Sequence, residues 1–227
     1  MKFGFSNNQL KIVAMIAMLV DHIGLYLFPD QLWMRVIGRL ALPIFAYMIA
    51  EGCFYTRHRG KYLLQIAVLA VGCQLVYYFA MGSLYQGILV TFSLSVITVY
   101  AIDYFIKKKN APSALLALTT LAAVVFLVLG LPRLLPNTDY FVDYGLGGVA
   151  LPVLVYFAKG KWGKLAATAI GLLAMALTLL PIQWWAFLAL PLIALYNGKR
   201  GKWNLKYMFY IFYPAHLGLL YLIGMLL

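Results

Sequence analysis

Five ionisable residues interrupt the first two apolar stretches of the chain, and they are of the types used in acid–base chemistry. These residues are Asp21, His22, Arg35, Arg39 and Glu51. An ionisable group inside a membrane segment is costly, so it indicates a functional site. Histidine is the side chain best suited to accept a proton near neutral pH. We therefore predict that these residues form the working site of a membrane enzyme.

Asp21 and Arg39 are predicted to meet as a buried ion pair. With a helical rise of about 1.5 Å per residue, both lie roughly 10 Å below the same membrane boundary. Neither charge would be tolerated alone in hydrocarbon. Adjacent residues on a helix diverge by about 100°, so Asp21 and His22 cannot form a dyad with each other. His22 must point elsewhere, toward a cavity or toward lipid, and its charged neighbours favour the cavity.

The last apolar stretch, residues 205–226, carries a second histidine. His216 falls near its middle, beside Tyr213. Lipid would not tolerate this histidine either. The sequence thus predicts a polar cavity shared by the first, second and last helices.

The remaining charged residues in or beside the apolar stretches have structural explanations that compete with a role in the site. Arg35 could be an interfacial anchor whose charged group reaches water. An ion pair between Glu51 and Arg57 is as well supported as a site role for either. Asp103 is predicted to pair with Lys107, one helical turn later.

Asp139 and Asp143 are at helical spacing and could form an external carboxylate pair, but without a third ligand they do not predict a metal site. Cys53 and Cys73 both lie in apolar stretches and have neither disulfide nor metal-site spacing.

The composition predicts an all-α polytopic membrane protein with one transmembrane domain, residues 1–227. The chain is 65% hydrophobic and 11% charged, with a mean hydropathy of +0.90, whereas soluble domains are about 25% charged. Apolar runs long enough to span a bilayer recur along the chain. About nine transmembrane helices are expected, at residues 10–28, 32–54, 61–82, 84–106, 111–131, 139–158, 163–180, 182–197 and 205–226.

The net charge of +12 does not indicate nucleic-acid binding, because the basic residues form short clusters between apolar stretches. Clusters follow the second, fourth, sixth and eighth stretches, whereas the intervening loops contain only Asp30 and Arg133 as charges. The positive-inside rule then predicts a cytoplasmic N-terminus and an external C-terminus in the cytoplasmic (inner) membrane. The short stretch at 182–197 could be tilted, re-entrant or only partly spanning.

Several motifs resemble the TraX family, named after the membrane protein that acetylates the N-terminus of conjugative pilin. They occur in order along nearly the whole chain, with Leu42 replacing an expected phenylalanine. The motifs are Asp21-His22-Ile23-Gly24, Arg35-Val36-Ile37-Gly38-Arg39, Pro43-Ile44-Phe45, Glu51-Gly52, Thr56-Arg57, Asp143-Tyr144-Gly145, Asn197-Gly198-Lys199-Arg200-Gly201, Lys206-Tyr207 and Phe212-Tyr213-Pro214-Ala215-His216-Leu217.

The resemblance implies an acetyl-CoA-dependent membrane acyltransferase, because the family is similar to transmembrane acyltransferases that use a helix-borne histidine. It makes His22 the catalytic candidate, with Asp21 and Arg39 beside it. The residues around it would bind substrate, namely Arg35, Glu51, Asp143, Tyr213 and His216. Basic residues would bind the phosphates of acetyl-CoA, namely Arg57, Arg59, Lys199, Arg200 and Lys202.

In this mechanism His22 would be the base that takes a proton from the acceptor amine, or would transiently carry the acetyl group. Arg39 would stabilise the oxyanion, in competition with Asp21. No metal is required. The acceptor is expected to be a peptide or pilin N-terminus, and a sugar or another amine or hydroxyl is the alternative. A proton- or anion-coupled transporter and an assembly subunit are the competing classes. The sequence leaves the oligomeric state and the side of acceptor entry open.

Overall fold

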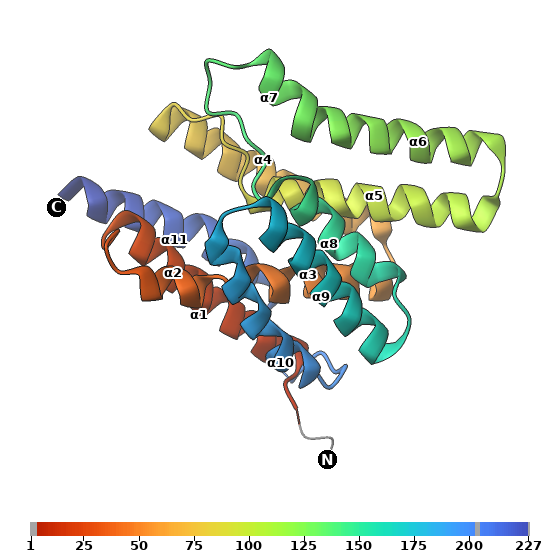
Figure 1. The fold of residues 1–227 in the computed structure, drawn as a ribbon, viewed down its shortest axis with the longest axis horizontal. Coiled ribbons are helices and arrows are strands. Elements are labelled where there is room, and N and C mark those ends of the chain that lie inside the picture. Colours follow the sequence, from red (N-terminus) through yellow and green to blue (C-terminus); the bar gives the residue numbers. More distant parts are fainter. Residues whose placement is uncertain (1–3, 203–204, 227) are drawn as a thin grey trace. The chain divides into compact units, whose positions relative to one another are not determined.

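A computed structural model describes residues 4–202 and 205–226, without the side chains of residues 206, 207, 209 and 210. Its regular elements in this part are helices, together with two isolated β-bridges. The α-helices are α1 (Asn7–Tyr26), α2 (Leu32–Gly38), α3 (Ala41–Tyr55), α4 (Arg59–Met81), α5 (Ile88–Lys108), α6 (Ala111–Val125), α7 (Leu131–Leu134), α8 (Gly145–Phe157), α9 (Gly160–Thr178), α10 (Ala189–Ala194) and α11 (Lys206–Leu226), with a π-helix η1 (Phe126–Gly130) and a 3₁₀-helix η2 (Pro181–Leu188) (Figure 1).

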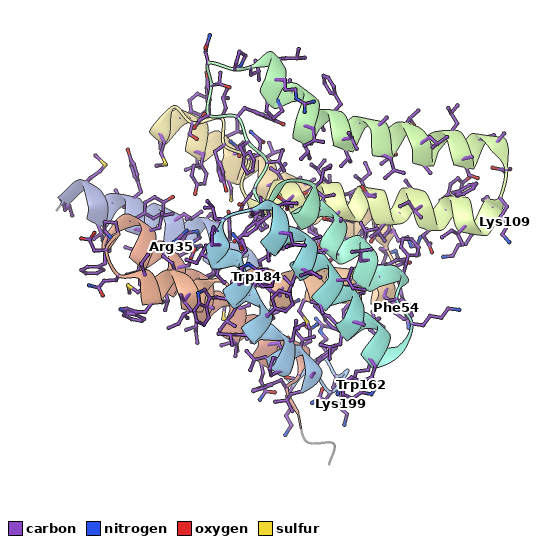
Figure 2. The ribbon with its side chains drawn as sticks, in the orientation of Figure 1. Arg35, Phe54, Lys109, Trp162, Trp184 and Lys199 are labelled. Atoms are coloured by element: carbon purple, nitrogen blue, oxygen red, sulfur yellow. The ribbon has the colours of Figure 1, made fainter. Side chains whose placement is uncertain are left out.

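All nine predicted stretches are largely helical, which confirms the all-α prediction. Among the described residues, five helical spans are long and apolar enough to cross a membrane. They are Asn7–Tyr26, Leu32–Tyr55, Arg59–Met81, Ile88–Lys108 and Ala111–Leu134. Large apolar side chains are exposed on the helices, as Phe54 in α3 (58%) and Trp162 in α9 (72%) show in Figure 2. The orientation of the chain in the membrane stays a prediction.

The chain packs as two compact units, which we describe separately. One unit comprises Met1–Met48 and Lys159–Leu227, and the other comprises Ile49–Ala158. This division does not test the prediction that residues 1–227 form one transmembrane domain. In the first unit, α1 packs against α2 and α11, and η2 packs against α2, α9 and α10. In the second unit, α5 packs against α4, α6 and α8, and α5 and α6 lie side by side (Figure 1).

The start of α1 is fixed by a capping box. The Ser6 hydroxyl accepts a hydrogen bond from the Gln9 backbone N–H, and the Gln9 side chain accepts one from the Ser6 N–H. These contacts satisfy donors that a helix start leaves without intrahelical partners. The N-cap residue of α1 is therefore Ser6.

Prolines interrupt two of the predicted stretches. The second one divides into α2 and α3 at Arg39 and Leu40, because Pro43 has no N–H to donate to the carbonyl of Arg39. The eighth one is a 3₁₀-helix followed by six residues of α10, which contains Pro191. A proline in each stretch therefore accompanies the break or the change of helix type.

In the second unit, the polar face of α5 bonds to the segment that begins α8. Thr91 donates to the Asp143 carbonyl at 2.8 Å, and Ser95 donates to the Val149 carbonyl at 2.9 Å. The Ser95 bond joins α5 to α8, a contact typical of serine and threonine side chains in membrane helices.

The expectation that Asp139 and Asp143 share a helix is wrong, because α8 begins only at Gly145. Asp139 instead accepts hydrogen bonds from the Ser83 hydroxyl and the Leu84 N–H. The segment between them is extended, since Val142 forms a β-bridge with Gln86. Tyr144, with φ +57°, then turns the chain into the helix.

Candidate functional site

Asp21 is buried in the first unit and is held by two arginines. Its Oδ1 accepts from Arg39 Nη2 and its Oδ2 accepts from Arg35 Nη1, both at 2.7 Å. The side chains of Asp21, Arg35 and Arg39 are 13%, 23% and 6% exposed. Arg35 also donates to the backbone carbonyl of Asp21, and Arg39 Nε donates to the carbonyl of Arg35. The predicted Asp21–Arg39 pair is confirmed, and Arg35 completes it as a three-residue cluster that joins α1 to α2.

Two glycines allow α1 and α2 to approach closely enough for this cluster. A Cβ built on Gly38 would overlap the Asp21 side chain, and one built on Gly24 would lie 2.7 Å from Met34 Cβ. Any larger residue at either position would therefore force the helices apart or displace Asp21. This close approach explains why each of the motifs Asp21-His22-Ile23-Gly24 and Arg35-Val36-Ile37-Gly38-Arg39 contains a glycine.

His22 and His216 are hydrogen-bonded to each other, with 2.8 Å between His22 Nδ1 and His216 Nε2. His216 is buried, at 5% exposure, and its Nδ1 lies 2.8 Å from the carbonyl oxygen of Phe212. The Phe212 ring stacks on His216 at a centroid distance of 4.7 Å, and the Tyr213 ring meets it edge-on at 5.7 Å. The predicted proximity of the first and last helices is confirmed by this pair.

These two hydrogen bonds determine the tautomers of both neutral imidazoles. A carbonyl oxygen can only accept, so His216 must carry its proton on Nδ1. Its Nε2 is then an acceptor, and His22 must donate through Nδ1–H. The lone pair of His22 is therefore on Nε2, which is the nitrogen able to take a proton from another molecule.

Ordinary side-chain spacing could not reveal this pair, because the two histidines are 194 residues apart in the sequence. The available signal was the cost of each histidine in a membrane segment.

The role of Arg35 was missed for a different reason. Its place near the helix start favoured an interfacial anchor, whereas the structure brings it to Asp21.

Four of the predicted site residues belong to the second unit. Glu51 is buried, Arg57 is exposed, and Asp143 contributes its carbonyl to Thr91. Arg59 binds the carboxylate of Asp103 and donates to the hydroxyl of Tyr156.

Lys107 joins this second-unit cluster at 2.7 Å from Asp103, which confirms the predicted Asp103–Lys107 pair. The Arg59 guanidinium, predicted to bind phosphate, therefore has an internal carboxylate partner. Its assignment to phosphate stays a prediction.

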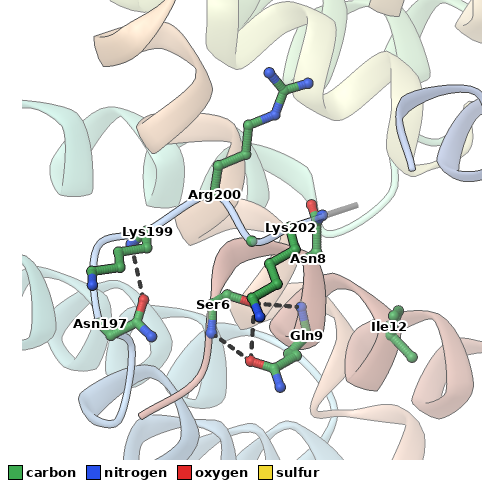
Figure 3. A pocket seen from close by; sticks show the side chains of 9 residues that line it. Ser6, Asn8, Gln9, Ile12, Asn197, Lys199, Arg200 and Lys202 are labelled. Carbon is green, nitrogen blue, oxygen red and sulfur yellow. Dashed lines mark hydrogen bonds between the residues drawn. The ribbon is translucent and has the colours of Figure 1, made fainter. Parts of the chain in front are cut away.

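The predicted basic residues of the first unit line a pocket at the start of α1. The pocket has a volume of about 510 Å³ and is lined in part by Lys199, Arg200 and Lys202 (Figure 3). All three side chains are exposed. The rest of the lining is provided by Ser6, Asn8, Gln9, Ile12, Asn197 and Gly201.

In the part of the chain that the structure describes, no three His, Cys, Asp or Glu residues are grouped as metal ligands would be. Cys53 and Cys73 are buried free thiols.

Comparison with known proteins gives a consistent family match. The model of the TraX protein family matches residues 6–224. The chain is 29% identical over 249 aligned positions to a "Probable fimbrial assembly protein FimC, serogroup H1" from Dichelobacter nodosus, covering 95% of this chain and 94% of that protein. It is 37% identical over 83 positions to "Protein TraX" of Escherichia coli K12, covering 34% and 32% of the two chains. No solved structure matches.

Proposed function

The chain belongs to the TraX family, and from this premise we propose that it is a multi-pass membrane acetyltransferase that uses acetyl-CoA to acetylate an amine. The observation that carries the proposal is the His22–His216 hydrogen bond beside the buried Asp21 cluster. It supplies an oriented imidazole with a lone pair on Nε2 in an apolar helical frame. A general base must be held in this way to take a proton from a reacting amine.

In the proposed reaction, the acceptor nitrogen attacks the carbonyl carbon of the acetyl thioester. A C–N bond forms, the C–S bond breaks, and the thiolate of CoA departs. The proton lost by the amine goes to His22 Nε2 and from there to the departing sulfur. While His22 is protonated, its Nδ1–H continues to donate to His216, so His216 helps to stabilise the imidazolium.

Asp21, Arg35 and Arg39 are assigned to positioning. Asp21 directly precedes His22 on α1, so the two arginines that bind Asp21 also fix the rotation of that turn relative to α2. Both guanidinium groups donate to Asp21, which argues against the oxyanion role considered for Arg39. A positioned base needs such support, because a displacement of about 1 Å can cost about 10²-fold in rate.

The test is acetyl transfer by the protein purified into nanodiscs, with isotope-labelled acetyl-CoA and three acceptors of different chemistry. A short peptide with a free N-terminus, an amino sugar and a hydroxyl compound separate the possible acceptor classes. We expect the peptide amine to be acetylated and His22→Ala to slow transfer about 10²- to 10⁴-fold. His58→Ala is the matched control, because His58 is exposed and precedes α4.

Transfer at the normal rate by His22→Ala would refute the role of this histidine. Failure of the wild-type protein to bind acetyl-CoA or to modify any of the three acceptors would instead favour a transporter or an assembly subunit. Neither of those classes needs to bind the donor.

A further inference from the structure

The side chains before and after His22 on its face of α1 differ in burial. Met18 and Tyr26 lie one turn before and one turn after His22, so all three share this face. Met18 is 8% exposed, whereas Tyr26 is 38% exposed. Leu25, beside Tyr26, is 45% exposed. His22 is therefore closed off toward the start of α1, and its exposed side is toward the end of the helix.

The neighbouring helices α11 and α2 cover this part of α1 on two further sides (Figure 1). On α11, His216 is buried and bonded to His22, and Leu220, one turn further, is also buried. On α2, Met34 packs against Gly24, two residues after His22, so closely that a Cβ on this glycine would lie 2.7 Å from Met34 Cβ. The route to His22 that these contacts leave passes Tyr26.

Tyr26 is placed to contact a molecule that approaches His22 by this route. Side chains on a helix lean toward its start and cover the preceding turn, which for Tyr26 is the turn that carries His22. The two rings are accordingly close, with centroids 6.1 Å apart and planes inclined by 31°. Because Tyr26 is also exposed, it forms one side of the entrance to the histidine.

The charges near this entrance make an aromatic ring suitable for binding an incoming ammonium group. The carboxylate of Asp21 is occupied by Arg35 and Arg39, and the cluster carries one excess positive charge. The other acidic residue of the first unit is Asp30, which is exposed and lies four residues beyond Tyr26. Asp30 attracts cations to this end of α1, and the electron-rich face of the Tyr26 ring can bind an ammonium group there.

We propose that Tyr26 is a specificity-determining residue, whose ring binds the ammonium form of the acceptor at the entrance to His22. This inference rests on the proposed function for the existence of an amine acceptor. Amines of peptides are mostly protonated at neutral pH, whereas a hydroxyl acceptor is neutral and gains nothing from this preference of the ring. The bound ammonium group releases one proton to water at this exposed end, and the neutral amine then reaches His22.

A tyrosine near the end of a membrane helix can also anchor the helix at the membrane boundary. Trp33 allows the two roles to be separated. It is 55% exposed near the start of α2, and its Nε1 donates to Gln31 Oε1 at 3.1 Å. An anchoring role predicts the same consequence when either ring is lost, whereas the entrance role predicts a consequence for Tyr26 alone.

The test measures binding of tetramethylammonium, a cation that cannot be acetylated, to the whole chain in nanodiscs without acetyl-CoA. The nitrogen-15 NMR signal of His22 reports binding, and tert-butanol is the neutral ligand of similar shape. We expect a response to the cation and none to the alcohol. Tyr26→Leu should weaken cation binding about fivefold, and Tyr26→Phe, which keeps the ring, should retain it. Trp33→Leu is the matched control and should leave the affinity unchanged.

Equal weakening by Tyr26→Leu and Trp33→Leu would assign Tyr26 to anchoring and overturn the proposal. So would a wild-type His22 signal that does not respond to the cation. If Tyr26→Leu does not fold, Tyr26→Phe and Tyr26→Trp decide, because loss of binding in both would refute the role of the ring.

Two results separate this proposal from the enzymatic one. Cation binding that depends on Tyr26, without acetyl transfer to any acceptor, supports the entrance and refutes the activity. Normal acetyl transfer with an unchanged KM for the peptide amine in Tyr26→Leu does the reverse.

Discussion

Two clusters in this protein have the same composition, one buried aspartate bound by two cations, but they differ in how far the cations are buried. In the first unit, the Arg35 and Arg39 side chains around Asp21 are 23% and 6% exposed. In the second unit, the Arg59 and Lys107 side chains around Asp103 are 37% and 61% exposed.

Burial decides how much each cluster matters to the protein. Water can replace a lost partner in the open cluster, whereas in the buried one a lost partner leaves an uncompensated charge. The buried cluster also lies beside His22, so its integrity bears on the candidate site as well as on stability.

The largest expected effect is that of Asp21→Asn, which leaves Arg35 and Arg39 without their carboxylate. Removing one partner of a buried pair costs about 3–5 kcal/mol. We expect a large fall in the thermal unfolding temperature in detergent and loss of acetyl transfer. Asp103→Asn is the matched variant. Equal losses of stability in the two variants would contradict the importance given to burial.

The next effect concerns His216, which we expect to orient His22 without touching substrate. His216→Ala removes the acceptor for His22 Nδ1–H and should slow transfer about 10²-fold. His216→Gln should retain part of the rate, because its amide oxygen can take the place of Nε2. His216→Asn is the matched variant, since its shorter amide cannot reach that position.

Nitrogen-15 NMR can observe the tautomers directly, because the chain has three histidines. In the wild type, His22 should be protonated on Nδ1, and this should persist in His216→Gln and be lost in His216→Ala. A spectrum with His22 protonated on Nε2 in the wild type would refute the assignment.

A smaller effect is expected for Gly38→Ala, which keeps every charge of the buried cluster but crowds Asp21. Overpacking of this kind costs about 1–3 kcal/mol. Transfer should fall because α1 and α2 are pushed apart beside His22. Gly72→Ala is the control, since a Cβ there meets no atom within 4 Å. It should not destabilise the protein, because alanine favours the helix interior, and it should leave transfer unaffected.

How much of the site was predictable depended on whether residues were linked by a short connection. Asp21 and Arg39 could be matched by depth, because the short connection predicted at residues 29–31 forces their helices to be antiparallel. The contribution of Arg35 needed the side-chain direction on a short helix that ends before Pro43. The His22–His216 bond needed the packing of α1 against α11, which no local pattern encodes.

The fold was predicted well where apolar length decides the element and less well where polar contacts compete. The helices up to Val125 begin within a few residues of the predicted bounds. The start of α8 was misplaced because Asp139 and Val142 pair with the segment at 83–86 instead of continuing a helix. Such pairing depends on a partner about 55 residues away.

Asp103→Asn in the open cluster should have a modest effect. It removes the carboxylate that links Arg59 at the start of α4 to α5, but both cations can then reach water. We expect a loss of about 1 kcal/mol, measured as a small shift in thermal unfolding. High salt should reduce the difference from wild type, because exposed charges are screened. A loss as large as that of Asp21→Asn would mean that this cluster is not open in the membrane.

Asp139 extends the comparison to an aspartate that is held by neutral hydrogen-bond donors, and its effect should be the smallest. The Ser83 hydroxyl and then the Leu84 N–H hold the pKa of Asp139 below its ordinary value of 3.8. Because the folded pKa is depressed, its stabilisation is complete above about pH 4 and is lost as the pH falls through the lower folded value.

The backbone bonds between Gln86 and the 141–143 segment remain at low pH, so protonation of Asp139 should loosen only its own end of the loop. Hydrogen exchange at the Leu84 amide should accelerate below about pH 4 relative to that at Gln86. In Asp139→Asn the Leu84 amide should exchange without this pH step. If exchange at the Gln86 amide accelerated equally, the Asp139 carboxylate would be stabilising the whole pairing between Gln86 and the 141–143 segment. The expectation that Asp139 has the smallest effect of the three aspartates would then be wrong.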